Sequence, residues 1–497
     1  MRFAVRALVL CALGAMLPVL APAQPAASVS LPQLLNRMRE VNGGLWNAHM
    51  SSTSPHTVDG DDAILDTEAQ GLRFLLDQCN VKVCLGTYFD GERLYSVNIN
   101  GTALPRSTSP EAYLRGLRII GTLAFLAPDF IAHGGRIDDG GWVTFEGKRC
   151  RRIFVSDQIA IPMAIFVDPA SGLVAGAQDV NGDATYAMHD YRRVGAFMLP
   201  YDIERNGAPL ERYITRKILA DPLDAPHGLT PRITSMPAGM ALDPSSTTPI
   251  GTCKIAGLSE RCLIDSGNSA LSMSKELAEQ LKLEPIGMMA ISGLGHYATG
   301  VVRTGPLQLG NVTFGDADYV VLSDIHQYGY DLVVGADVLA SMPVTIDTAK
   351  HAIFFGAQTA VADSTEVPLA FQNFVPVVSV TLGALPTDLA VDTGDQSNIN
   401  LAFRYYQEHP NLFHPTKSVV VSGVGTRSEE LIGEISSVRI GGLTAENQEI
   451  GTTKALKGTA NGHLGAGFLS KYRITLDYAH QLLKLLPKAA AQTHGRI

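Results

Sequence analysis

Residues 263–270 read LIDSGNSA, and a closely similar stretch, AVDTGDQS, occupies residues 390–397. In each stretch an apolar run leads into an Asp, a hydroxyl residue and a Gly. A single D-[ST]-G sequence carries little information, because these residue types are common in turns. The presence of two copies raises the question whether they form separate surface turns or one site.

The two stretches begin a longer internal repeat. Three later blocks recur in the same order, at nearly the same offset that separates Asp265 from Asp392. Four blocks in one order at nearly one offset indicate two related structural units. The later blocks are ISGLG (291–295) with VSGVG (421–425), LQLGNVTF (307–314) with VRIGGLTA (438–445), and 332–355 with 462–485.

Each repeat is predicted to be rich in β-strands. A strand enters the D-[ST]-G loop, and a short helix follows it, over residues 274–283 in the first repeat and 401–409 in the second. A glycine-rich hairpin, paired strands and an apolar segment ending in Gly come next.

With these motifs, about residues 246–488 resemble the aspartic proteases of the pepsin and retropepsin superfamily, with both lobes on one chain. The resemblance implies two β-barrel lobes, over residues 250–357 and 362–488. It also implies that Asp265 and Asp392 are the catalytic pair and that the substrate is a peptide or protein.

Elementary electrostatics favours the same arrangement. Two carboxylates held close together cannot both ionise cheaply, so they share a proton and titrate as a coupled pair. The ionised group takes a proton from a trapped water while the protonated group polarises the scissile carbonyl. This chemistry needs no cofactor and no metal, and it predicts activity at acidic to mildly acidic pH.

Four neighbouring residues support the pair by the same resemblance. Ser266 and Thr393 are expected to turn their hydroxyl groups toward the opposite loop and hold the two aspartates in place. Gly267 and Gly394 are expected to allow close backbone approach and amide hydrogen bonds to the carboxylates.

The hairpin over residues 291–300 is similar to a flap that closes over a bound peptide. Gly293 and Gly295 would let this hairpin bend, and Tyr297 is a candidate for substrate contact. Its alternative interpretation is an ordinary glycine-rich hairpin. Residues 422–433 would be the counterpart in the second lobe.

The repeats depart from the family pattern near the candidate site. The apolar segments that back the two loops end at Gly335 and Gly465, but His463 stands where an apolar residue is expected. Asn268 and Asp395 occupy positions that usually hold a small uncharged residue. A third carboxylate beside the pair would raise the cost of ionising it, or could point to solvent or bind a cation.

The N-terminal part of the chain shows a different pattern. Residues 30–220 contain predicted helices over 31–42 and 109–126 among many short strands, which predicts a curved antiparallel sheet with helices, an α+β arrangement in a mainly β protein. The stretch DYRRVGAFMLPYDIE (190–204) resembles the late strands of bacterial lipoprotein-carrier proteins, which implies an apolar ligand. A module without any ligand is the alternative. Residues 221–249, rich in Pro, Ser, Thr and Gly, are predicted to be a linker.

Residues 1–23 have the features of a signal peptide, with Arg2 and Arg6 before an apolar run and a small-x-small cleavage site at 21–23. Without them the chain has 37 basic and 48 acidic residues, a net charge of −11. The acids are dispersed and there is no basic patch, so nucleic acid is not an expected partner. No later segment is predicted to span a membrane. We therefore expect an exported protein, periplasmic or secreted.

Five cysteines remain after the predicted cleavage, and an exported protein can use them in disulfides. Cys253 and Cys262 could bridge two strands of a hairpin, and Cys79 and Cys84 could close a short loop, which would leave Cys150 free. Spacing alone does not determine the pairing.

The sequence therefore predicts an exported aspartic endopeptidase. One alternative is a non-catalytic protein that binds peptide, lipid or lipoprotein with a degenerate protease fold. A second is that each repeat pairs with another chain. Substrate preference and oligomeric state stay open at this stage.

Overall fold

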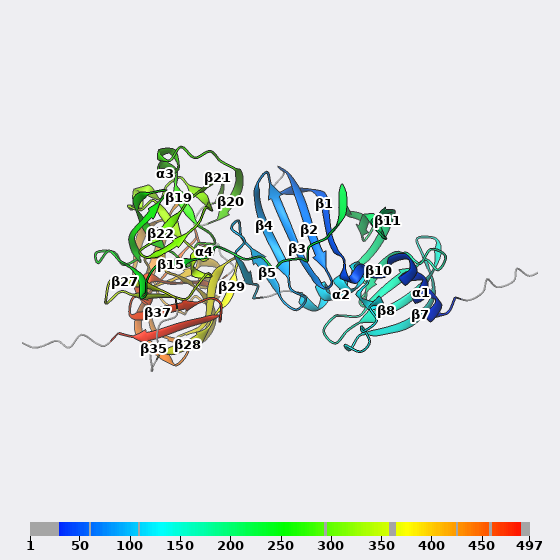
Figure 1. The fold of residues 1–497 in the computed structure, drawn as a ribbon. Helices are drawn as coiled ribbons and strands as arrows, with labels where there is room; N and C mark the ends of the chain where they lie inside the picture. Colours follow the sequence, from blue (N-terminus) through cyan, green and yellow to red (C-terminus); the bar gives the residue numbers. More distant parts are fainter. Residues whose placement is uncertain are drawn as a thin grey trace, which may run out of the picture.

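The computed structural model is mainly β, as the sequence predicts. It is elongated, with the N-terminal region at one end and the two repeats at the other (Figure 1). Among the residues described, no helix has the length and apolar character needed to cross a membrane. The structure describes residues 29–58, 61–107, 110–292, 296–356, 364–423, 426–456 and 460–488.

The N-terminal region contains two seven-stranded antiparallel sheets, with the strand orders β14-β1-β2-β3-β4-β5-β6 and β13-β12-β11-β10-β9-β8-β7. Consecutive strands are neighbours almost throughout, because short turns join antiparallel strands directly. The strands of the first sheet are β1 (His49–Val58), β2 (Asp61–Gln70), β3 (Arg73–Asn80), β4 (Val83–Phe89), β5 (Leu94–Val97), β6 (Ala103–Pro105) and β14 (Thr215–Leu219). Those of the second are β7 (Arg136–Phe145), β8 (Lys148–Ser156), β9 (Met163–Val167), β10 (Val174–Asp179), β11 (Thr185–Val194), β12 (Phe197–Arg205) and β13 (Ala208–Arg212).

Two helices pack against these sheets. Helix α1 (Leu31–Asn42) lies where the sequence predicts it, and the Ser30 amide at its start donates to the Gln33 side chain over 3.0 Å. Helix α2 (Glu111–Gly121) is shorter than the predicted 109–126. It ends because Leu123 takes a left-handed conformation (φ 54°), and a short 3-10 turn, η2 (Ala124–Leu126), follows.

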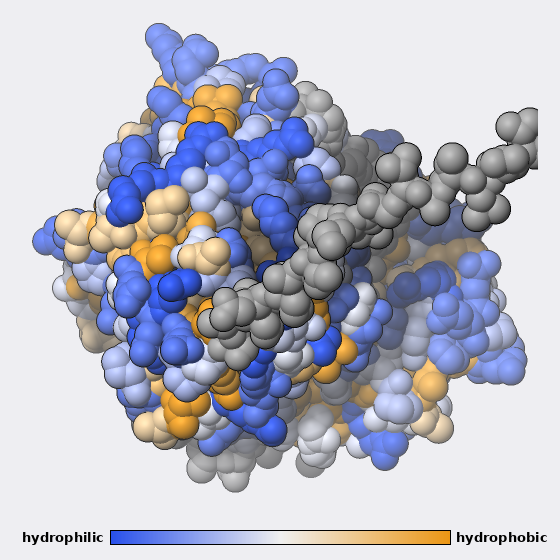
Figure 2. Space-filling model, turned by 90° about the vertical axis from the view of Figure 1, so that its right-hand side faces the viewer, coloured by the Kyte–Doolittle hydropathy of each residue, from blue (hydrophilic) through white to orange (hydrophobic). Residues whose placement is uncertain are grey.

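The core of the N-terminal region is filled by side chains from both helices and both sheets. Leu34 and Met38 of α1, Ile119 of α2 and Phe89 and Phe125 are fully buried in it. An apolar ligand in this region stays a prediction. Figure 2 shows the end of the molecule that carries the β7–β13 sheet, where hydrophilic residues cover most of the visible face and hydrophobic residues form small separate groups.

The structure contains a Cys79–Cys84 disulfide, whose cysteines face each other directly across β3 and β4 with Cα atoms 4.1 Å apart. Cys253 and Cys262, which the sequence suggested as a second bridge, are instead buried free thiols, as is Cys150. The reason is the register of the hairpin, which places Cys253 opposite Glu260 and makes Cys262 its diagonal neighbour. Cys253 Sγ donates to the carbonyl of Glu260 over 3.7 Å, and the two thiols are not covalently joined.

Each repeat contributes one large sheet. The first has the order β15-β23-β22-β17-β18-β25-β19-β24-β21-β20, and the second β29-β30-β31-β36-β32-β35-β34-β33. The strands of the first are β15 (Arg232–Ile233), β17 (Ile250–Ile255), β18 (Leu258–Ile264), β19 (Ser272–Ser274), β20 (Gly287–Ser292), β21 (His296–Thr304), β22 (Leu307–Leu309), β23 (Val312–Phe314), β24 (Ala317–Leu322) and β25 (Leu332–Val334). Those of the second are β29 (Ala370–Gln372), β30 (Val375–Leu382), β31 (Leu385–Asp392), β32 (Ile399–Ala402), β33 (Lys417–Gly423), β34 (Thr426–Ile440), β35 (Leu443–Thr453) and β36 (Gly462–Gly465).

A six-stranded sheet joins the two repeats, with the order β16-β27-β26-β37-β38-β28. Its central pair, β26 and β37, takes one strand from each repeat, and one continuous hydrophobic core runs through all three sheets. The strands are β16 (Ala238–Ala241), β26 (Val344–Asp347), β27 (Ala352–Phe355), β28 (Thr365–Pro368), β37 (Tyr472–Asp477) and β38 (Leu482–Pro487). The short helices of the repeats are α3 (Lys275–Gln280), α4 (Ala336–Leu339), α5 (Phe403–Glu408) and α6 (Ala466–Leu469), with a 3-10 turn, η3 (His326–Tyr328).

The segment predicted to be a linker, residues 221–249, contains two short strands that belong to the sheets of the repeats. Strand β15 pairs with β23, and β16 pairs with β27. This segment is therefore part of the sheets at its C-terminal end.

Candidate active site

The two D-[ST]-G loops emerge from equivalent places in the two large sheets. Strand β18 leads into Asp265 and runs parallel to β25, and β31 ends at Asp392 and runs parallel to β36. The Asp265 amide donates to the carbonyl of Val334 over 2.9 Å, which attaches the first loop to β25. Each aspartate thus lies at the end of a strand held in the interior of its sheet.

Asp265 and Asp392 meet between the repeats, and their carboxyl groups hydrogen-bond to each other. The neighbouring glycines permit this approach. A Cβ atom added to Gly267 would lie 2.6 Å from Cγ of Asp392, and one added to Gly394 would lie 2.5 Å from Cγ of Asp265. Any side chain at either glycine would therefore collide with the opposite aspartate.

The hydroxyl groups of Ser266 and Thr393 link the two loops by four reciprocal hydrogen bonds. Ser266 Oγ donates to the carbonyl of Val391 over 2.6 Å and accepts the Thr393 amide over 3.0 Å. Thr393 Oγ1 donates to the carbonyl of Ile264 over 2.8 Å and accepts the Ser266 amide over 3.0 Å. Both residues are buried, so the four bonds form away from solvent. The pair is thus built within one chain.

Backbone amides hold each carboxylate in place. The Gly267 amide donates to Asp265 Oδ1 over 2.7 Å. Asp392 Oδ1 accepts from the amides of Gly394 and Asp395, over 3.0 and 3.1 Å. The second oxygen of Asp392 is left for another partner.

That partner is His463. Its Nδ1 lies 3.1 Å from Asp392 Oδ2 and 3.5 Å from Asp395 Oδ2. His463 lies on β36 directly beside Ala390 of β31, and this pairing carries its imidazole to the loop that holds Asp392. Its side chain is 21% exposed and that of Asp392 is 15% exposed, so the ion pair is mostly shielded from water.

These contacts shift the pKa values of the two aspartates in opposite directions. Burial, together with the charge of Asp392, raises the pKa of Asp265 well above its ordinary value. Burial also acts to raise the pKa of Asp392, but the hydrogen bond and charge of His463 outweigh it and hold that pKa below its ordinary value. Burial acts to lower the pKa of His463, yet the two carboxylates raise it to about 10.

Asn268 follows Gly267 and Asp395 follows Gly394, and these two departures from the family pattern make different contacts. The Asn268 side chain donates to the carbonyl of Ala270 over 2.7 Å and to Ser272 Oγ over 3.1 Å. Asp395 accepts the Ser397 amide with one oxygen over 2.9 Å and faces His463 with the other. Its negative charge is therefore paired with His463.

Gly335 and Gly465 end the two apolar segments that lie behind the D-[ST]-G loops. Close contacts with these loops leave no room for a side chain at either glycine. A Cβ atom at Gly335 would lie 2.2 Å from the carbonyl oxygen of Asn268, and one at Gly465 would lie 2.2 Å from that of Ser397. The next amide in each repeat, Ala336 or Ala466, donates to a carbonyl of the D-[ST]-G loop. The backing segments thus support the loops in both repeats.

The predicted flap is a β-hairpin made by β20 and β21, in which Tyr297 pairs with Ile291. Burial raises the pKa of Tyr297. Gly293 and Gly295 lie outside the described residues. The counterpart in the second repeat is the hairpin of β33 and β34.

Among the residues that the structure describes, two groups of side chains bring three possible ligand atoms within 4.8 Å of one another: Glu146, His189 and Glu204, and Asp392, Asp395 and His463. The first group is partly exposed on the N-terminal region. In the second, His463 Nδ1 lies within ion-pair distance of both carboxylates. We assign no metal to either group.

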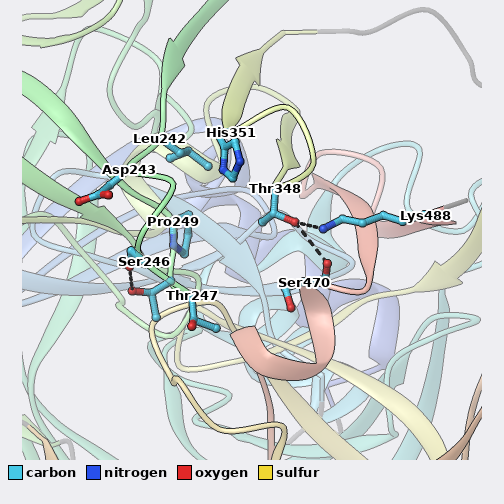
Figure 3. A pocket seen from close by; sticks show the side chains of 10 residues that line it. Leu242, Asp243, Ser246, Thr247, Pro249, Thr348, His351, Ser470 and Lys488 are labelled. Carbon is cyan, nitrogen blue, oxygen red and sulfur yellow. Dashed lines mark hydrogen bonds between the residues drawn. The ribbon is translucent and has the colours of Figure 1, made fainter. Parts of the chain in front are cut away.

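A pocket of about 240 Å³ lies apart from the aspartates, between residues 242–249 and the C-terminal part of the second repeat (Figure 3). Asp265, Asp392 and His463 do not line it. Thr348 accepts from Lys488 there and donates to the carbonyl of Ser470 over 3.2 Å, so part of its polar lining is already paired.

Sequence reasoning noted His463 as a departure but did not place it in the site. A signal was present, because His463 and Asp395 both depart from the pattern in the same repeat. The equivalent positions of the first repeat hold the neutral residues Val333 and Asn268. Residues of opposite charge introduced together in the repeat of Asp392 indicate that the two side chains are in contact.

Comparison with known proteins supports the resemblance of the first repeat to aspartic proteases. Residues 251–338 match a family model described as aspartyl protease. A search of curated proteins gives no match to the chain. The matched segment includes Asp265, Ser266, Gly267 and Gly335, so these residues belong to an aspartyl protease-like domain.

Proposed function

We propose that the chain is an exported aspartic endopeptidase that hydrolyses peptide bonds with Asp265, Asp392 and an activated water. The observation that carries the proposal is the contact between the two carboxyl groups, held by reciprocal hydrogen bonds between the loops. The aspartyl protease-like domain over residues 251–338 supports it.

The chemistry follows from the protonation of the pair. With one proton between them, the ionised carboxylate takes a proton from the attacking water, and the protonated carboxyl donates its proton to the carbonyl oxygen of the scissile bond. The tetrahedral intermediate then collapses as a proton passes to the leaving amine. The backbone amides of Gly267 and Gly394 keep both carboxylates oriented through these steps.

The substrate is proposed to be an extended peptide that lies between the two hairpins, β20–β21 and β33–β34. Export is supported by the signal-like character of residues 1–23 and by a disulfide in the N-terminal region, since disulfides persist in oxidising compartments.

Separate Asp265→Asn and Asp392→Asn variants test the mechanism. We expect each to lower kcat/KM by about 100-fold or more, since each removes one half of the acid–base pair. The readout is mass spectrometry of cleavage in a mixed peptide library, between about pH 3 and pH 8.

The matched control is Asp388→Asn, on the same strand as Asp392 but with an exposed carboxyl that accepts a hydrogen bond from Ser379. It should cleave like the wild type. If wild-type protein cleaves and both active-site variants retain full activity, the mechanism is wrong. If the wild type binds peptides without cleaving any, the non-catalytic alternative is favoured.

A further inference from the structure

The two repeats differ in charge at the positions that flank their aspartates. Beside Asp392 the second repeat has His463 and Asp395, whereas the first has Val333 and Asn268 at the equivalent positions. Asn268 bonds within its own loop, and Val333 is a buried apolar residue. The electrostatic environment of the aspartates is therefore asymmetric although the backbone arrangement is repeated.

His463 contacts both carboxylates of its own repeat through one nitrogen. Nδ1 lies 3.1 Å from Asp392 Oδ2 and 3.5 Å from Asp395 Oδ2. The backbone fixes this position, because β36 pairs with β31 on one side and with β32 on the other. Since the other oxygen of Asp392 accepts two backbone amides, this carboxylate has donors on both oxygens.

Two acidic groups from other elements act on this cluster. Asp265 approaches from the first repeat and interacts with the charge of His463. Glu430 of β34 interacts with Asp395. Strand β32, which pairs with β36 on the other side, contributes no ionisable side chain.

Two tyrosines also lie within electrostatic reach of the aspartates. The phenols of Tyr330 and Tyr478 interact with the charges of both Asp265 and Asp392. Burial is the main cause that raises the pKa of each phenol, so both stay neutral while the carboxyl groups titrate. The imidazole of His463 is therefore the cationic group that acts on Asp392.

We propose that His463 is a positioning residue that, held between Asp392 and Asp395, keeps Asp392 ionised and thereby places the shared proton of the pair on Asp265. Asp392 is then the group that takes a proton from water, and Asp265 is the group that donates to the substrate carbonyl. The second half of this proposal rests on the proposed protease function, whereas the placement of the protons does not.

The charges balance in this arrangement. His463 contributes one positive charge and Asp395 one negative charge, so the four groups together carry the single negative charge of an ordinary half-protonated pair. Asp395 therefore does not disable the site, because His463 neutralises it. A buried negative charge without such a partner would strongly disfavour ionisation of Asp392.

Nitrogen NMR of the full-length ¹⁵N-labelled protein tests the proton placement without any assay of activity. His463 resonances are identified by their loss in His463→Gln. We expect both ring nitrogens to be protonated at about pH 7.5, well above the ordinary histidine pKa. In Asp392→Asn the pKa of His463 should fall by about 1 unit or more, because an adjacent anion is removed.

The pH profile of kcat/KM tests the consequence for the reaction. In His463→Val and His463→Gln the acid limb of this profile, where kcat/KM falls as the pH is lowered, should move to higher pH by about 1 unit or more. The reason is that Asp392 loses its cationic partner and binds a proton more tightly. The double variant His463→Val/Asp395→Asn copies the neutral pair of the first repeat, and its acid limb should return toward the wild type. His463→Gln retains a polar side chain and serves if the valine variant does not fold.

Two results would overturn the proposal. One is a neutral His463 at about pH 7.5 in the wild type. The other is a loss of kcat/KM by the same factor at every pH in the His463 variants, which is what a purely structural role predicts. If the wild type shows no cleavage, the proposed function fails and NMR alone decides the proton placement.

Discussion

At the scale of single residues, the site depends on two hydroxyl groups and two glycines. Ser266 and Thr393 each donate to the opposite loop and accept from it, and Gly267 and Gly394 leave room for the opposite aspartate. These requirements are local and sterically strict, so a short motif can encode them. The same motif cannot say what stands beside the aspartates in space.

Thr393→Val tests the hydroxyl link while preserving the shape of the side chain. It removes one donor and one acceptor in a buried place, so we expect a loss of about 1–3 kcal/mol in the free energy of unfolding, measured in urea. A lower kcat/KM should accompany it, because the loops lose their fixed separation. Thr393→Ser keeps the hydroxyl and is the control. A valine variant as stable and active as the serine variant would contradict the role.

At the scale of elements, the hairpin of β33 and β34 brings an unusual group toward the catalytic loop. Glu430 is a buried carboxyl on β34 and lies over Gly451 of β35, where a Cβ atom would collide with it. Burial, and then the charges of Asp395 and Glu449, raise its pKa to about 7. The hairpin thus carries an acid that titrates near neutral pH.

Glu430→Gln should stabilise the protein above about pH 7 and have little effect near pH 4. Below the ordinary glutamate pKa both states are protonated, whereas above the raised pKa the folded wild type must hold a buried charge. The stability contributed by protonated Glu430 is therefore lost as the pH rises. We expect about 1 kcal/mol, less than the full pKa difference implies because solvent screens part of the charge.

Urea unfolding at the two pH values measures this difference. Glu429→Gln is the control, because its carboxyl is exposed on the same strand and accepts a hydrogen bond from Ser418. A pH-independent effect of Glu430→Gln would show that the pKa of Glu430 is the same in the folded and unfolded states, which would contradict the raised pKa.

At the scale of the whole molecule, the N-terminal region is attached to the first repeat just behind the loop of Asp265. Asp337 of α4 is 1% exposed and accepts hydrogen bonds from Asn98, Asn100 and Thr102, the turn between β5 and β6, over 2.7–2.8 Å. It also accepts the amide of Leu271, which follows the catalytic loop, over 2.8 Å. The N-terminal region thus supplies three of the donors that this buried carboxyl needs.

The double variant Asn100→Ala/Thr102→Val should lower the free energy of unfolding by about 2–5 kcal/mol, because a buried carboxyl loses two donors. It should also lower kcat/KM, since Asp337 holds the segment that follows Asp265. Asn36→Ala, exposed on α1, is the control. Unchanged unfolding of the repeats in the double variant would show that the N-terminal region is only tethered to them.

Another contact between the two parts reaches the β20–β21 hairpin, the predicted flap. A Cβ atom at Gly287 of β20 would lie 2.6 Å from Val83 and 3.0 Å from the carbonyl oxygen of Asn80, in the hairpin closed by the Cys79–Cys84 disulfide. The sequence shows no trace of this contact, because the residues involved belong to distant parts of the chain.

Much about this protein is determined by the sequence itself. The alternation of short apolar strands predicts a mainly β protein, and the internal repeat places Asp265 and Asp392 at equivalent positions of two related units. Helix α1 and the short helices α3 and α5 lie within their predicted ranges. These features depend on local spacing, which a chain displays directly.

Only the tertiary structure decided which partners are contacted by the residues that depart from the family pattern. The pairing of β36 with β31 brings His463 to Asp392 and Asp395 from a distant part of the repeat, and the hairpin register makes Cys253 and Cys262 diagonal neighbours with free thiols. Asp337 likewise finds its donors in another region. Ion pairs and buried hydrogen bonds depend on distances of a few ångströms between distant segments, and those distances exist only once the sheets have packed.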